Sequence, residues 1–236
     1  REMDQLDCWF PEVKQLIGLE QDPVFHPEGD VWNHTMEVID RAAAFRDKVS
    51  DSYSFMLLAL THDFGKIVTT EFVKGRIHAY EHEIKGMPLV EEFVRRITGE
   101  KAVIDYVINM VPLHMRPNVA AYSKPALKST NRMFDAAVSP EDLIWFAAAD
   151  RPVFSGSDAF SGDSDFLFER LKAYEKTMAA PYVAGRDLIA AGLKPGEDFS
   201  EILAYAHKLR LAGIQKDSAL KQTITYAQKM RRKAQK

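Results

Sequence analysis

The sequence predicts an all-α protein. Apolar residues recur at intervals of three and four along most of the 236 residues, as in the segment 31–49, and this is the spacing of one buried helix face. Helix starts are also marked: Ser139 is followed by Pro140 and two acids, the order expected of a cap, a first turn and favourable charge near the helix dipole. The chain is 46% hydrophobic and shows no internal repeat, so it can bury the core of one large domain or one and a half.

The predicted helices follow one another with loops between them. Loops are expected at 21–30, 65–77, 151–163 and 181–185, and the second of these contains a short extended piece at 71–73. Ser50 or Asp51 is expected to cap the helix that follows. Helices are predicted over 6–17 (interrupted at Pro11), 31–49, 52–64, 82–98, 100–113, 125–137, 139–150, 165–178 and 186–191, with two more after the turn at 192–196.

Overall charge gives no sign of a nucleic-acid partner. The net charge is −3 and the isoelectric point about 6.2. The segment 221–236 is an exception, since it holds six basic residues and no acid. It is either the solvated end of the last helix or a contact to an RNA backbone. We predict a domain of residues 1–180 and a helical extension of residues 181–236 that packs on it.

Cysteine content and hydropathy indicate a cytoplasmic protein. Cys8 is the only cysteine, so neither an intrachain disulfide nor a cysteine metal cluster is expected, which fits a reducing compartment. No apolar run approaches the ~18 residues that cross a bilayer, and no secretory signal is found, so we expect no membrane partner. The chain begins at Arg1 rather than Met, and we expect either a trimmed protein or the tail of a longer one.

A histidine and a carboxylate stand side by side at the end of an apolar predicted helix. His62 and Asp63 follow the run 55–60, and Gly65 comes two residues later. Because glycine alone enters the left-handed region without strain, Gly65 is expected to end the helix and to leave both side chains facing a loop. An imidazole beside a carboxylate suits a divalent cation, and mixed sites accept manganese, iron, nickel, cobalt, zinc or magnesium.

Further candidate ligands lie near other predicted helix ends. His34 opens the helix 31–49 and Asp150 ends the helix 139–150, so both could join His62 and Asp63 in one site built from several helices. Two imidazoles and two carboxylates suit a catalytic metal with open positions better than a closed structural zinc.

A second ion is a further possibility. His82 and His114 could hold it, with Asp63 bridging two metals roughly 3.5–4 Å apart. His78 stands four residues before His82, on the same face if the segment is helical, and either could be the ligand. We favour His82 because it lies deeper in the predicted helix. One ion or two therefore stay open.

Positive side chains near these ligands could bind an anionic substrate. Lys66 follows Asp63 by three residues and could stabilise a developing phosphorane. Arg116 and Arg151 follow two of the candidate ligands and are either substrate contacts or ordinary solvated charges. His26 and His207 are interpreted as surface or hydrogen-bonded residues.

At these residues the sequence resembles a known family. His34, the pair His62-Asp63 and the late Asp150 match the H…HD…D signature of the HD-domain metal-dependent phosphohydrolases. A closer resemblance, along almost the whole chain, is to the C-terminal HD region of bacterial CCA-adding tRNA nucleotidyltransferases. The stretches that resemble it are Phe10-Pro11-Glu12, His26-Pro27-Glu28-Gly29-Asp30-Val31-Trp32-Asn33-His34-Thr35, Leu60-Thr61-His62-Asp63-Phe64-Gly65-Lys66, His78 with Glu81-His82-Glu83 and Gly86, and the ending Gly185-Arg186-Asp187-Leu188-Ile189 with Gly192-Leu193-Lys194-Pro195-Gly196.

The resemblance implies an HD-domain helical bundle with phosphatase and 2′,3′-cyclic phosphodiesterase activity. In that family a separate N-terminal head transfers nucleotides. This sequence has no Gly-Gly strand-turn and no Asp-x-Asp pair on a predicted strand, so nucleotide addition to tRNA is not expected of it. The resemblance thus implies the hydrolase half alone, either freestanding or excised.

We therefore expect a metal-dependent phosphohydrolase in which metal-activated hydroxide attacks a phosphomonoester or a 2′,3′-cyclic phosphodiester of a nucleotide or an RNA end. Asp63 and Lys66 would be catalytic, and Arg116, Arg151 and His78 would bind substrate. The alternative is a tRNA-, RNA- or nucleotide-binding module with a non-catalytic metal site. The hydrolase better explains why the candidate ligands gather at helix ends.

Overall fold

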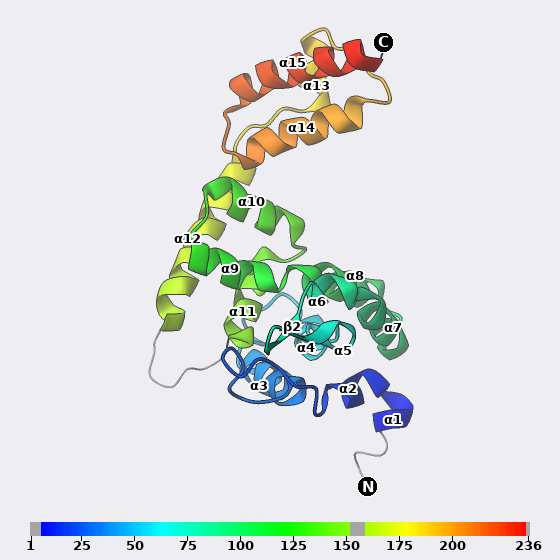
Figure 1. Cartoon of the computed structure of the whole chain (residues 1–236). Coiled ribbons are helices and arrows are strands. Elements are labelled where there is room, and N and C mark those ends of the chain that lie inside the picture. The colour runs from blue at the N-terminus through cyan, green and yellow to red at the C-terminus, as the bar shows by residue number, and fades with distance from the viewer. Residues whose placement is uncertain (1–5, 152–158, 235–236) are drawn as a thin grey trace. The chain divides into compact units, whose positions relative to one another are not determined.

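The computed structural model describes residues 6–151 and 159–234 (Figure 1). Helices make up most of these residues, and the all-α prediction is confirmed. In the described part of the chain the strands are β1 (Thr70–Val73) and β2 (Arg76–Ala79). The helices are α1 (Leu6–Trp9), α2 (Pro11–Leu16), α3 (Val31–Ala43), α4 (Ser52–Thr61), α5 (Lys66–Thr69), α6 (His82–Lys85), α7 (Met87–Ile97), α8 (Lys101–Met110), the 3-10 helix η2 (Val111–Leu113), α9 (Met115–Ser123), α10 (Leu127–Ala136), α11 (Pro140–Asp150), α12 (Ala159–Ala179), α13 (Gly185–Ala190), α14 (Phe199–Leu211) and α15 (Lys216–Ala234).

Several predicted boundaries were wrong. α3 ends at Ala43 and not at 49, and the expected helix 82–98 is divided at Gly86 into α6 and α7. α5 and α9 were not predicted, and α12 begins at Ala159, inside the expected loop 151–163. Residues 152–158 of that loop lie outside the described part of the chain.

The extended piece expected at 71–73 is confirmed, and it belongs to a hairpin. β1 pairs antiparallel with β2, with Thr70 opposite Ala79 and Val73 opposite Arg76. The two connecting residues, Lys74 and Gly75, have φ values of 51° and 81°. Two left-handed residues in a row match the twist of a two-residue hairpin loop. The hairpin places His78 on a strand, so His78 and His82 do not share a helix face as expected.

Local sequence explains where the central helices begin. Asp51 caps α4, since its carboxylate accepts a hydrogen bond from the backbone N–H of Tyr53 at 3.1 Å. Ser139 occupies the cap position of α11, as predicted, although its side chain makes no capping hydrogen bond within the described structure. Pro140 fills the first turn of α11, where the missing N–H costs little.

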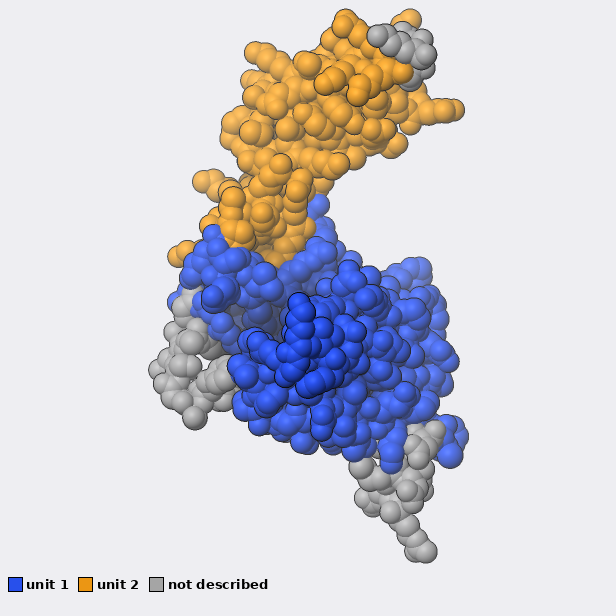
Figure 2. Space-filling model, viewed as in Figure 1, with its two compact units in different colours: residues 1–124, 135–168 blue, residues 125–134, 169–236 orange. Residues whose placement is uncertain are grey.

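The chain divides into two compact units, which Figure 2 colours separately. Unit 1 comprises residues 1–124 and 135–168, and unit 2 comprises residues 125–134 and 169–236. In unit 1, α4 packs against α3, α8 and α11, and its residues Phe55, Leu58 and Ala59 are fully buried. The central position of α4 fixes the segment that follows it, which contains His62 and Asp63. The expected division at residue 180 stays a prediction.

Unit 2 has its own small core. α14 packs against α15, and α13 also contacts α15. Buried apolar residues from all three helices and their connections form the core, namely Val183, Leu188, Leu193, Ile202, Ala206, Ala219 and Ala227. Across the described residues, no helix combines the length and the apolar character needed to cross a membrane.

Candidate metal centre

Six candidate ligands come from the ends of different helices in unit 1, as predicted. His34 lies in the first turn of α3, and His82 is the first residue of α6. His62 and Asp63 follow α4, His114 lies between η2 and α9, and Asp150 is the last residue of α11. The four histidines and Asp63 are buried, and Asp150 is nearly so.

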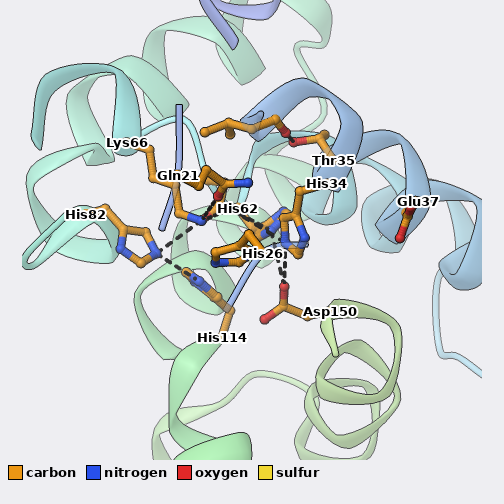
Figure 3. A network of polar contacts seen from close by, with 12 residues as sticks. Gln21, His26, His34, Thr35, Glu37, His62, Lys66, His82, His114 and Asp150 are labelled. Carbon is orange, nitrogen blue, oxygen red and sulfur yellow. Dashed lines mark hydrogen bonds and ion pairs between the residues drawn. The ribbon is translucent and has the colours of Figure 1, made fainter. Parts of the chain in front are cut away.

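These side chains converge on one centre (Figure 3). Asp150 Oδ1 lies 3.1 Å from His34 Nε2 and 3.4 Å from His62 Nε2. Asp63 Oδ2 lies 3.7 Å and 3.4 Å from the same two nitrogens. On its other side, Asp63 Oδ1 is 3.1 Å from His82 Nε2, which in turn is 3.3 Å from His114 Nε2. Asp63 therefore stands between a His34–His62 pair and a His82–His114 pair.

All four histidines are held in the same way. Each imidazole uses Nδ1 to hydrogen-bond an oxygen outside the centre and turns Nε2 towards it. Such outer contacts fix the tautomer and ring orientation of metal-binding histidines. The oxygen partners are Glu28 Oε1 for His34 (2.6 Å), Ala59 O for His62 (3.0 Å), Ala79 O for His82 (3.0 Å) and Val111 O for His114 (2.7 Å).

Two buried atoms at the centre lack hydrogen-bond partners among the described residues. They are His62 Nε2 and Asp63 Oδ2, the latter in an ion pair with Lys66 Nζ at 2.7 Å. Another buried carboxylate, Asp142, is fully satisfied, because it accepts from the Ser50 N–H, the Ser50 hydroxyl and the Tyr106 hydroxyl. Buried polar atoms without hydrogen bonds are costly, and a bound cation could satisfy both His62 Nε2 and Asp63 Oδ2.

The electrostatics agree with this interpretation. Burial disfavours the charged form of His62, but Asp63 and Asp150 outweigh it and raise the pKa of His62 to about 10. Burial also opposes ionisation of Asp63, yet Lys66 and His62 hold the pKa of its carboxyl well below the usual range. Burial and the neighbouring His62 lower the pKa of His114 to about 4, which keeps that imidazole neutral. The two carboxylates thus stay ionised and attract positive charge into a buried site.

Gly65 and Gly86 bring His82 to this centre. Gly65 was expected to end the helix in the left-handed region, and this was wrong, because its φ is −63° and α4 has already ended at Thr61. Its role is close packing. A Cβ on Gly65 would lie 1.8 Å from the His82 carbonyl oxygen, and a Cβ on Gly86 would lie 2.2 Å from the Gly65 Cα. Only two glycines allow these backbone segments to touch.

A cavity of about 630 Å³ opens beside the centre. Lys66, His78 and Arg151 line it, together with five of the six candidate ligands, all except His62. Lys66 is buried and also donates to Gln21 Oε1, and Arg151 pairs with Asp163. Arg116 is exposed on α9 and is not among the cavity-lining residues. The substrate roles given to His78, Arg151 and Arg116 stay predictions.

The sequence patterns did not predict that Glu28 supports His34 or that His26 lies at the cavity. The Glu28 side chain is 6% exposed, and its Oε1 lies 2.6 Å from His34 Nδ1 and 2.9 Å from His26 Nδ1. Burial opposes its ionisation, but the bonds to the two histidines lower the pKa of Glu28 to about 2. His26 lines the cavity. Both residues belong to the stretch 26–35 that carries the family resemblance, which was the available signal.

Glu28→Gln is expected to weaken metal affinity by about tenfold to a hundredfold, because the outer partner of His34 would lose its charge. Glu37→Gln is the matched control and should leave affinity unchanged, because Glu37 is an exposed glutamate of α3, the helix that carries His34, and pairs with Arg41. Competition for manganese or zinc against a chelator would measure both variants. Equal affinities for Glu28→Gln and the unsubstituted protein would show that Glu28 does not support the ligand.

Comparison with known proteins relates the chain to one group. It is 31% identical to a multifunctional CCA protein of Nitrosococcus oceani over 82% of this chain, 28% identical to that of Thioalkalivibrio sulfidiphilus over 82%, and 29% identical to that of Cupriavidus pinatubonensis over 94%. The chain is thus similar to multifunctional CCA proteins. It spans about half of their length, 46%, 46% and 51% respectively. No family model and no solved structure matches the chain.

Proposed function

We propose that unit 1 is an HD-type metal-dependent phosphohydrolase. Its substrates are phosphomonoesters or 2′,3′-cyclic phosphodiesters of nucleotides or RNA ends. The observation that supports this most strongly is that four histidines converge on two ionised carboxylates at the wall of a cavity. Each of these histidines hydrogen-bonds through Nδ1 to an oxygen outside the centre. A closed structural zinc site would have no use for such a cavity, whereas a catalytic site needs room for substrate.

The arrangement supports either one ion or two. His34, His62 and Asp63 form one group whose ligand atoms lie within 4.8 Å of one another, and Asp63, His82 and His114 form a second. Asp150 adds an oxygen to the first group. A third group consists of His26, Glu28 and His34. We interpret it as the hydrogen-bonded support of His34, because both of its histidines already direct Nδ1 at Glu28.

The side chains at the centre have different roles in the proposed hydrolysis. A divalent ion bound here would lower the pKa of water towards neutrality and polarise a phosphoryl oxygen. Asp63 belongs to both groups, so its carboxylate would help to hold an ion bound in either of them. Lys66 brings an ammonium group to the same wall, where it can neutralise charge that develops on the phosphoryl group.

The similarity to multifunctional CCA proteins is consistent with this proposal. The name of these proteins assigns more than one function to a single chain, and the present chain corresponds to about half of that length. The match to the Cupriavidus pinatubonensis protein covers 94% of this chain and so includes the segment that carries the candidate ligands; hydrolysis would then be one of those several functions.

Hydrolysis of a panel of esters tests the proposal, followed as AMP formation from the cyclic diester and as phosphate release from the monoesters. The panel holds 2′,3′-cyclic AMP, 2′-AMP, 3′-AMP and p-nitrophenyl phosphate, with manganese, nickel, cobalt or magnesium added. Turnover should be lost in His34→Ala and retained in His207→Ala, a histidine of unit 2. Absence of turnover with every metal, together with strongly salt-dependent tRNA binding, would favour the RNA-binding module.

A further inference from the structure

An apolar helix face lines the same cavity. Met115, Val119 and Tyr122 occupy positions i, i+4 and i+7 of α9, so they lie on one side of the helix, and all three line the cavity. Their exposed fractions are 40%, 57% and 89%. Phe25, from the loop that precedes α3, is 58% exposed and lines the cavity as well. We call these four residues the apolar ledge.

The ledge is not part of the hydrophobic core. Core residues of α9 are Pro117, Ala120 and Ala121, which are buried and lie at other positions around the helix. Within the described structure Tyr122 has no recorded hydrogen bond or ring contact, and its ring is nearly fully open to solvent. A group of exposed apolar side chains beside a polar pocket is typical of a ligand-binding surface.

The cavity therefore has two chemically different parts. The ionised carboxylates, the histidines and Lys66 are buried, whereas the ledge residues are exposed. A phosphate group would occupy a small part of a volume of about 630 Å³. Pockets of roughly 300–1,000 Å³ hold whole drug-sized ligands. The geometry thus suits a ligand with an anionic end and a flat apolar end.

We propose that the apolar ledge binds the nucleobase of a nucleotide substrate and determines the preference of the site for nucleotides over small phosphate esters. This inference rests on the proposed phosphohydrolase function. A nucleobase has two flat faces that stack on aromatic side chains, and such stacking tolerates any base. Tyr122 and Phe25 supply exposed rings, and Met115 and Val119 supply apolar contact at the same wall.

The double variant Val119→Ser/Tyr122→Ser tests the ledge. Both side chains are exposed, so the fold should be preserved. Tyr53→Ser/Val138→Ser is a matched control, because Tyr53 and Val138 are 47% and 58% exposed and do not line the cavity. Each protein is assayed with 3′-AMP and with glycerol 2-phosphate, which has no base. Binding of adenosine, which has no phosphate, is followed separately by ligand-observed NMR.

The ledge variant should raise KM for 3′-AMP by about tenfold, with kcat and the KM for glycerol 2-phosphate nearly unchanged. It should also lose adenosine binding, while the control keeps it. Turnover of both esters with equal KM values in all proteins would overturn the ledge and leave the hydrolase intact. Adenosine binding that depends on the ledge, without turnover of either ester, would support the ledge and contradict the hydrolase. Self-association lost in the ledge variant, without adenosine binding, would show that a second copy covers this face.

Discussion

Asp63→Asn is expected to lower the rate of phosphate release by about a thousandfold or more, since ligands of a catalytic metal contribute several kcal/mol of transition-state stabilisation. Asp63 is the only described carboxylate that contacts both histidine pairs, with Oδ2 3.4 Å from His62 Nε2 and Oδ1 3.1 Å from His82 Nε2. Asparagine has nearly the same shape as aspartate but lacks the negative charge that lies between the His34–His62 pair and the His82–His114 pair. Phosphate release and bound metal, measured on one preparation, check this result.

Asp142→Asn is the control for that variant. Asp142 is also a buried carboxylate of unit 1, but its partners are Ser50 and Tyr106, away from the metal centre. Loss of its charge should lower the free energy of unfolding, because an amide replaces an oxygen that accepts hydrogen bonds, and should leave metal content and kcat unchanged. If both variants lost activity equally, general destabilisation and not metal chemistry would explain the effect.

Gly86→Ala is expected to destabilise unit 1 by about 3 kcal/mol and to remove the His82 side of the centre. The new methyl group would approach the Gly65 Cα at 2.2 Å and the Gly65 nitrogen at 2.5 Å, and these are backbone atoms that cannot swing aside. Relief of the clash must move α6 away from Gly65, and His82 is the first residue of α6. Denaturant unfolding and metal content measure the two consequences.

Gly99→Ala is the matched control for the packing argument. A Cβ at Gly99 meets no atom within 4 Å, and its backbone is not left-handed, so the substitution should be neutral or slightly stabilising. A Gly86→Ala protein as stable as Gly99→Ala, with metal content unchanged, would show that the two backbone segments are not tightly packed. The predicted order of stability is Gly99→Ala above Gly86→Ala.

The candidate ligands were accessible to sequence reasoning for a simple physical reason. Each lies where an apolar helical run begins or ends, and a bundle brings such helix termini together. His34, the His62-Asp63 pair and Asp150 were placed together on this ground, and their Nε2 and Oδ atoms do lie within 3.1 to 3.7 Å of each other across helices. The signal is strong because a polar side chain at the end of a buried helix needs a polar partner or an ion.

Other features depend on long-range contacts that no local pattern reveals. The role of Gly65 comes from its approach to His82 and Gly86, not from its own φ. Glu28 lies in a loop with no periodicity, and its function is visible only once His34 is beside it. α9 was not predicted, although its Pro117 lies in the first turn, where proline is tolerated. Without that helix, the ledge on α9 was not predicted either.

The metal centre is tested most directly by the number of divalent ions bound per chain, counted by elemental analysis after saturation with manganese and removal of free metal. We expect at least about one ion per chain in the unsubstituted protein, about two if both histidine pairs are occupied, and loss of that metal in Asp63→Asn. A folded protein that stays free of metal after saturation with manganese, zinc, cobalt or nickel would contradict the central claim that this cluster is a metal centre.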